Sequence, residues 1–205
     1  MRPGRTRSLF PMDWNLFHTV NGWSRDSAWA HGFFRSFADY GTVLFGLALV
    51  VAFLIGLRGD ARVMARSVWT GAAAIVALIV NQPIANIVDR ARPYTLHPHV
   101  LTLVDRGKDP SFMSDHSLVA GAVAVGLLFA VRRLGYIAVA LAFLMAFTRV
   151  YVGAHYPGDV AAGLIFGGGI AAAGIPLADR ILVPWCERAQ GTLLLSRFRN
   201  TPTND

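Results

Sequence analysis

The chain has 205 residues, of which 54% are hydrophobic and 15% charged, and its mean hydropathy is +0.46. Soluble domains carry roughly 25% charged residues, and disordered chains are far less apolar. The single cysteine, Cys186, excludes a disulfide scaffold. The apolar residues come in long runs, not in alternation, which predicts an all-α, polytopic membrane protein.

The N-terminal segment, residues 1–40, is expected to lie at the membrane interface. It carries too many charged residues for a lipid-facing crossing. Trp29, Phe33, Phe34 and Phe37 recur at i, i+4, i+5 and i+8, which predicts a short amphipathic helix. A cluster of arginines at the start of this segment is not followed by a long apolar run, so no cleaved signal peptide is expected.

Residues 41–178 form the predicted transmembrane catalytic domain. A crossing needs about 20 apolar residues, so we expect about five transmembrane helices, with the third and fourth extended by neighbouring residues. A buried hairpin of a soluble protein would explain two such runs, but not five. The uncharged runs are Gly41–Leu57, Ser67–Val88, Ser117–Val131, Leu134–Thr148 and Val160–Ala178.

The basic residues indicate the orientation of these helices. The net charge is +7, and every basic residue except Lys108 is an arginine. Because the arginines lie in short segments between apolar runs, they favour the positive-inside rule over a nucleic-acid partner. Residues 58–66, 132–133 and 179–205 are therefore expected in the cytoplasm, and 89–113 and 151–159 outside. Five crossings then place the N-terminus outside, although its arginines favour the inside.

The two outer connections hold an unusual set of polar residues. A single ionisable residue at the end of a span is often only a snorkelling anchor, but that interpretation explains a whole set on one side poorly. Guanidinium groups match the geometry of phosphate oxygens, and a helix N-terminus is an anion site. Ser114 is predicted to cap one helix and Pro157 to begin another. The set therefore predicts a phosphate site made of Arg90, Arg92, Ser114, His116, Arg149, His155 and Asp159.

Two histidines add reactivity to this site. One imidazole can attack phosphorus while the other acts as a general acid. Asp159, four residues after His155, is expected to accept a hydrogen bond from one ring nitrogen and leave the other free. A zinc site is the alternative interpretation, but Arg92 and Arg149 would repel a cation, so no metal is expected. The other two outer-loop histidines, at positions 97 and 99, are expected to be solvated.

These residues resemble a known signature. Arg92-Pro93, Ser114-Asp115-His116 and Arg149-x5-His155-x3-Asp159 are similar to the three blocks of the type 2 phosphatidic acid phosphatase superfamily, over about residues 40–178. The bacterial undecaprenyl-diphosphatase branch is the most similar. The resemblance implies a nucleophilic His155 oriented by Asp159, and His116 as the acid for the leaving group. It also implies that Arg92, Arg149 and Ser114 hold the phosphoryl oxygens, with no metal or other cofactor.

The chain departs from the family pattern at several positions. Ala85 stands where the first block often has a lysine, so we expect Arg90 or Lys108 to supply the missing charge. Met113 replaces a usual proline, Asp115 a frequent glycine and Thr148 a common serine.

The sequence thus predicts a membrane enzyme that hydrolyses undecaprenyl diphosphate to the monophosphate at the outer face of the bacterial plasma membrane. Its partners would be the lipid substrate and membrane lipids. Phosphatidic acid or phosphatidylglycerophosphate as substrate, and phosphotransfer to another lipid, remain alternatives. A non-enzymatic transporter subunit would explain the spans but not the polar set, because transporters tend to place ionisable groups near the midplane.

Overall fold

The computed structural model describes the backbone of residues 11–199 and the side chains of residues 13–192. The N-terminal arginine cluster and the polar tail from residue 200 lie outside the described residues. Every regular element within 11–199 is a helix, which confirms the predicted all-α class. The elements are α1 (Pro11–Asp26), the 3-10 turn η1 (Ala28–Ala30), α2 (His31–Tyr40), α3 (Thr42–Arg58), α4 (Ala61–Val88), α5 (Pro93–Leu96), α6 (Asp115–Ala130), α7 (Arg132–Tyr151), α8 (Pro157–Ala173) and α9 (Ile175–Arg199).

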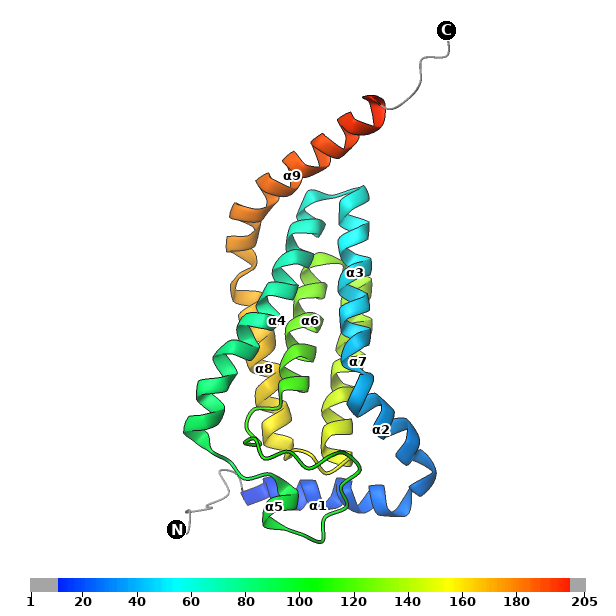
Figure 1. The fold of residues 1–205 in the computed structure, drawn as a ribbon, viewed down its shortest axis with the longest axis vertical. Helices are drawn as coiled ribbons and strands as arrows, with labels where there is room; N and C mark the ends of the chain where they lie inside the picture. The colour runs from blue at the N-terminus through cyan, green and yellow to red at the C-terminus, as the bar shows by residue number, and fades with distance from the viewer. Residues whose placement is uncertain (1–10, 200–205) are drawn as a thin grey trace.

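The five apolar runs form five helices of one bundle, α3, α4, α6, α7 and α8 (Figure 1). Within the described residues, Ala61–Leu96 and Arg132–Tyr151 are long and apolar enough to cross a membrane unaided. The number rises to four if α2 with α3, and α8 with α9, each form one bent span. The predicted third crossing, α6, has only 16 residues. It lies inside the bundle, where most of its residues are buried against protein, so it does not need the length that lipid demands.

Small residues let α6 approach its neighbours. A Cβ added at Gly121 would lie 2.3 Å from the main-chain oxygen of Leu164, and one at Gly167 would lie 2.0 Å from that of Leu118. The backbones of α6 and α8 are therefore in direct contact, as small residues allow between membrane helices. This contact places the N-termini of the two helices side by side at one end of the bundle.

The N-terminal segment is not one amphipathic helix. It forms α1, η1 and α2, and α1 lies across the end of the bundle (Figure 1). The predicted aromatic face is divided: Phe37 is buried and the Phe34 ring lies 4.1 Å from that of Tyr151, whereas Trp29 is 89% exposed. The break at η1 turns part of the predicted aromatic face away from the protein, which leaves Trp29 on the outer surface.

The C-terminal helix also differs from the expected boundary at residue 179. Helix α9 already begins at Ile175, and it packs against α4. Arg66 binds the Asp179 carboxylate with two hydrogen bonds of 2.8 and 2.6 Å. Cys186 packs in an apolar cluster with Ala61. The charged start of the predicted C-terminal segment is therefore an internal contact of the helix bundle.

Candidate active site

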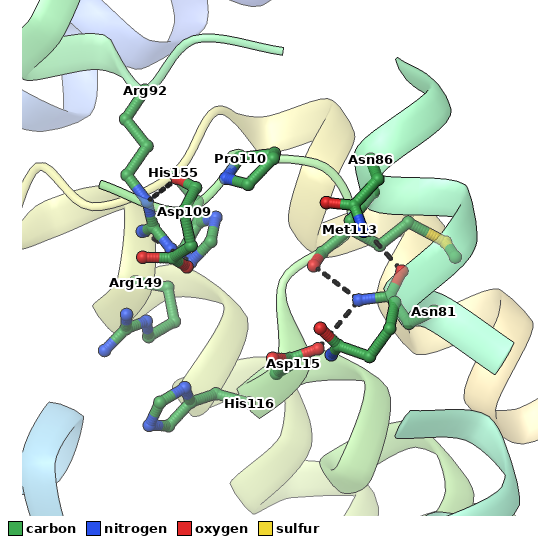
Figure 2. Close-up of a pocket in the computed structure, with 12 residues that line it drawn as sticks. Asn81, Asn86, Arg92, Asp109, Pro110, Met113, Asp115, His116, Arg149 and His155 are labelled. Atoms are coloured by element: carbon green, nitrogen blue, oxygen red, sulfur yellow. Dashed lines mark hydrogen bonds and ion pairs between the residues drawn. The ribbon is translucent and has the colours of Figure 1, made fainter. Parts of the chain in front are cut away.

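A cavity of about 320 Å³ lies at the end of the bundle where α6 begins and α7 ends (Figure 2). The long connection, residues 89–113, supplies part of its lining. Four predicted site residues meet there, although they come from three separate parts of the sequence. The lining consists of Asn81, Gln82, Ala85, Asn86, Arg92, Asp109, Pro110, Met113, Asp115, His116, Arg149 and His155.

Two helix starts position the histidines. The Ser114 side chain accepts a hydrogen bond from the Ser117 amide and caps α6, which confirms the predicted cap. Pro157 occupies the first turn of α8, also as predicted. His155 precedes that turn, and Gly153 before it has a φ of +80°. A side chain at Gly153 would meet the main-chain oxygen of Leu101, so the chain requires glycine here.

The hydrogen bonds of His155 define its tautomer. Its Nδ1 lies 2.8 Å from the main-chain oxygen of Ser111, which can only accept, so we assign the proton to Nδ1. Its Nε2 lies 3.2 Å from Nη1 of Arg92, which can only donate. Nε2 therefore carries the lone pair. The imidazole presents a nucleophilic nitrogen beside the arginine that is expected to hold the phosphoryl group.

The surroundings of His155 keep it neutral. The side chain is 2% exposed. Burial lowers the pKa of His155 well below its ordinary value, and the nearby positive charges of Arg149 and Arg92 lower it further. A neutral imidazole is the form that can attack phosphorus, so the low pKa favours the reactive state.

The expected hydrogen bond between Asp159 and His155 is not formed. Oδ2 of Asp159 lies 4.0 Å from Nδ1 of His155, which is too far. This oxygen instead accepts hydrogen bonds from the Ser111 hydroxyl and from the Tyr156 amide. The turn before α8 moves the carboxylate away from the ring, and Ser111 lies between them. Asp159 is therefore connected to His155 through Ser111, a residue that sequence reasoning missed because no spacing pattern marks it.

Arg149 is a buried cation in the cavity wall, and it forms no ion pair with any residue that the structure describes. Its side chain comes from the end of α7 and is 8% exposed, and its Nε has no hydrogen-bond partner. Its Nη1 donates to the main-chain oxygen of Ala38, at 3.5 Å. Arg92 is paired with Asp109 of the long connection. Buried charges are normally compensated, so this wall is suited to bind an anion.

Two expected phosphate ligands do not line the cavity. Ser114 is fully buried as the cap of α6. Arg90 binds Asp159 and Asp13, each at 2.6 Å. Lys108, the alternative source of charge, is exposed and also absent from the lining. His97 stacks on Trp14 with ring centroids 3.7 Å apart, so it is not simply solvated as expected.

The opposite wall of the cavity is neutral and belongs to α4 (Figure 2). The Asn81 amide donates to the Asp115 carboxylate at 2.7 Å and to the main-chain oxygen of Met113 at 3.1 Å. Asn81 thus ties α4 to the start of α6, a role that the sequence did not reveal. Gln82 and Asn86 are exposed on either side of Ala85.

Within the described residues, no three His, Cys, Asp or Glu side chains are close enough to form a metal site.

The fold and this site define a membrane phosphatase. Residues 66–181 match the PAP2 superfamily, and the chain belongs to that family. All three signature blocks lie at the described site, with Arg92, His116, Arg149 and His155 around one cavity.

Individual relatives extend the comparison. Undecaprenyl-diphosphatase BcrC of Bacillus subtilis is 30% identical over 154 residues, which are 75% of this chain and 78% of that protein. A lipid A 1-phosphatase of Rhizobium etli is 38% identical over 110 residues, 49% of this chain and 47% of that protein. The crystal structure of LpxE from Aquifex aeolicus superposes with a TM-score of 0.66 at 23% identity and covers 82% of this chain and 97% of that one. At this identity, the superposition shows the fold alone.

Proposed function

We propose that this protein hydrolyses a polyprenyl diphosphate, undecaprenyl diphosphate in particular, to the monophosphate and inorganic phosphate. The observation that carries the proposal is the pairing of a nucleophile with an anion site. Nε2 of His155 carries a lone pair, and the guanidinium groups of Arg92 and Arg149 flank the same cavity.

The reaction would proceed in two displacements. Nε2 of His155 attacks the terminal phosphorus, a P–N bond forms, and the bond from phosphorus to the bridging oxygen breaks. His116 gives its proton to that oxygen, which leaves with the lipid monophosphate. Water then attacks the phosphohistidine, the P–N bond breaks, and His116 takes the proton of the water. Arg92 and Arg149 stabilise the charge on the three equatorial oxygens.

No metal ion is needed for these steps. The two guanidinium groups supply the positive charge that a divalent ion supplies in other phosphoryl-transfer sites. A bound cation beside Arg92 and Arg149 would be repelled by both.

Likeness to the Bacillus enzyme supports a diphosphate substrate, because it extends over three quarters of this chain.

The distribution of arginines supports a site on the outer side of the membrane. Arg58, Arg62, Arg132 and Arg133 lie at the end of the bundle opposite α1 and α5 (Figure 1). By the positive-inside rule that end faces the cytoplasm of the bacterial cell, so the cavity faces outward. A reporter fused after Arg133 should then read as cytoplasmic, and an external reading there would overturn the orientation.

A lipid phosphomonoester on a sugar is a second candidate. The likeness to a lipid A 1-phosphatase reaches 38% identity over the half of the chain that it covers. The α4 wall also favours this candidate. Gln82 and Asn86 present neutral amides there, whereas a wall that binds a second phosphate is expected to carry positive charge. Amides can bind sugar hydroxyls by donating and accepting hydrogen bonds.

Phosphate release from a lipid panel distinguishes these functions. The purified protein in detergent is given undecaprenyl diphosphate, lipid A, phosphatidic acid and phosphatidylglycerophosphate at equal mole fraction. We expect the highest kcat/KM for undecaprenyl diphosphate. A higher value for lipid A would favour the second candidate. Transfer of phosphate to an added lipid alcohol, without release, would indicate a phosphotransferase.

A further inference from the structure

We infer that Asp13 of α1 and Arg90 of the long connection are positioning residues for the nucleophile, joined in one buried ionic relay with Asp159. The inference rests on the proposed phosphatase activity, and it assigns a catalytic contribution to an N-terminal helix that lies outside the three signature blocks. It also gives Arg90 a role different from the phosphate ligand expected from the sequence.

The relay is a chain of short contacts. Arg90 donates through Nη1 to Asp159 and through Nη2 to Asp13, each at 2.6 Å. The second oxygen of Asp13 accepts a hydrogen bond from the Gly158 amide at 2.7 Å, in the first turn of α8. Asp13 therefore holds both the arginine and the start of the helix that carries Asp159. The Arg90 guanidinium is thus the shared counterion of the Asp13 and Asp159 carboxylates.

Burial makes this relay sensitive to the loss of any member. The side chains of Asp13 and Asp159 are 3% and 0% exposed, and that of Arg90 is 11% exposed. The Arg90 guanidinium also lies over the Tyr156 ring, 4.1 Å from its centroid. Removing one partner of a buried ion pair leaves the other charge uncompensated. The surrounding groups must then move to solvate that charge.

The groups that would move are those that hold His155. The main-chain oxygen of Arg90 accepts from the Ser111 amide at 2.7 Å. Ser111 in turn holds Nδ1 of His155 through its carbonyl and binds Asp159 through its hydroxyl. Arg90 thus contacts both supports of the ring, yet it does not line the cavity. A substitution keeps the main-chain bond to Ser111 and removes only the guanidinium, so its effect should reach the nucleophile through Asp159 and leave the substrate contacts intact.

Steady-state kinetics with a substrate that the wild type hydrolyses test this inference, with farnesyl diphosphate in detergent as the first probe. We expect Arg90→Met to lower kcat about 100-fold with KM nearly unchanged, because small misplacements of reacting groups have costs of this size. Asp13→Asn should lower kcat about 10-fold, since it keeps an oxygen for Gly158 and loses the ion pair. The double variant should be no slower than Arg90→Met alone, because the two residues act as one unit. Arg90→Lys should recover part of kcat.

Two exposed residues provide matched controls. Asp26→Asn removes a carboxylate from the same helix α1, and Arg133→Gln removes an arginine from the opposite end of the bundle. Both should keep the wild-type kcat and KM. Elution of each variant as a single detergent-solubilised species, with a cooperative thermal transition above the assay temperature, shows that it is folded. If Arg90→Met does not fold, Asp13→Asn and Arg90→Lys provide the same comparison.

Several results would overturn the inference. A raised KM with unchanged kcat in the Arg90 variants would make Arg90 a substrate ligand. Wild-type kinetics in folded Asp13→Asn and Arg90→Lys would remove the relay from catalysis, as would strictly multiplicative effects in the double variant. These results are separate from failure of the proposed function, in which the wild type itself would release no phosphate from any lipid in the panel.

Discussion

The main-chain oxygen of Ser111 lies 2.8 Å from Nδ1 of His155 and is the acceptor that fixes the imidazole tautomer. A carbonyl oxygen can only accept a hydrogen bond, so whenever the imidazole is neutral it selects the tautomer with the proton on Nδ1. The carboxylate of Asp159 lies behind Ser111 and supports it. The orienting group and the acidic residue are thus two separate parts of this site.

This separation predicts a moderate effect of Asp159→Asn. In a serine triad, where the acid binds the histidine directly, the equivalent change costs about 10⁴-fold in kcat. Here the Ser111 carbonyl still selects the tautomer, so we expect a loss of about 10²-fold. Ser111→Ala, which keeps the carbonyl, should cost less than Asp159→Asn. A loss near 10⁴-fold in Asp159→Asn would show that the carboxylate binds the ring directly during turnover.

The low pKa of His155 predicts the acid limb of the pH profile. Burial and the charges of Arg149 and Arg92 favour the neutral imidazole, so kcat/KM should fall only below the ordinary histidine range. Arg149→Gln removes one of these charges and should move the acid limb of the residual activity to higher pH. The shift is measured against wild type with the same substrate, whose own ionisation then cancels. A shift to lower pH would contradict the assignment of His155 as the titrating base.

Metal independence gives a third prediction. Activity should persist in excess EDTA, because Arg92 and Arg149 supply the positive charge at the phosphoryl site. Vanadate, an analogue of the pentacoordinate phosphoryl group, should inhibit in competition with substrate. Loss of activity on chelation, restored by added Zn²⁺, would contradict this account.

The neutral wall at Ala85 gives a fourth prediction. Ala85 lines the cavity, whereas Arg90 and Lys108 do not. Ala85→Lys should therefore lower KM for a diphosphate lipid, about tenfold for one added charged hydrogen bond, with a smaller effect on a monophosphate lipid. Lys108→Ala is the matched control and should leave both KM values unchanged. An increase in KM for the diphosphate in Ala85→Lys would mean that the wall binds the neutral part of the substrate.

Local signals explain which features the sequence could predict. The starts of α6 and α8 depend on Ser114 and Pro157 and their immediate neighbours, so both were predictable. The apolar runs identified the bundle helices for the same reason. The ion pair of Asp13 with Arg90 joins residues 77 positions apart, and the hydrogen bond of Ser111 with His155 joins residues 44 apart. Such contacts depend on how helices pack, and no periodicity or spacing encodes them. The hydrogen bond expected between His155 and Asp159 does not form, because helical spacing does not extend back through the turn before Pro157.

Acid-quenched turnover with lipid diphosphate labelled by ³²P at the terminal phosphate tests the central claim most directly. The wild type should form an acid-labile labelled adduct on His155, and His155→Ala should form none and release no phosphate. His116→Ala should form the adduct slowly, and most slowly when the leaving group is poor, because a good leaving group needs no proton. A labelled adduct that persists in His155→Ala would place the nucleophile elsewhere. Wild-type phosphate release in both histidine variants would contradict the phosphatase mechanism as a whole.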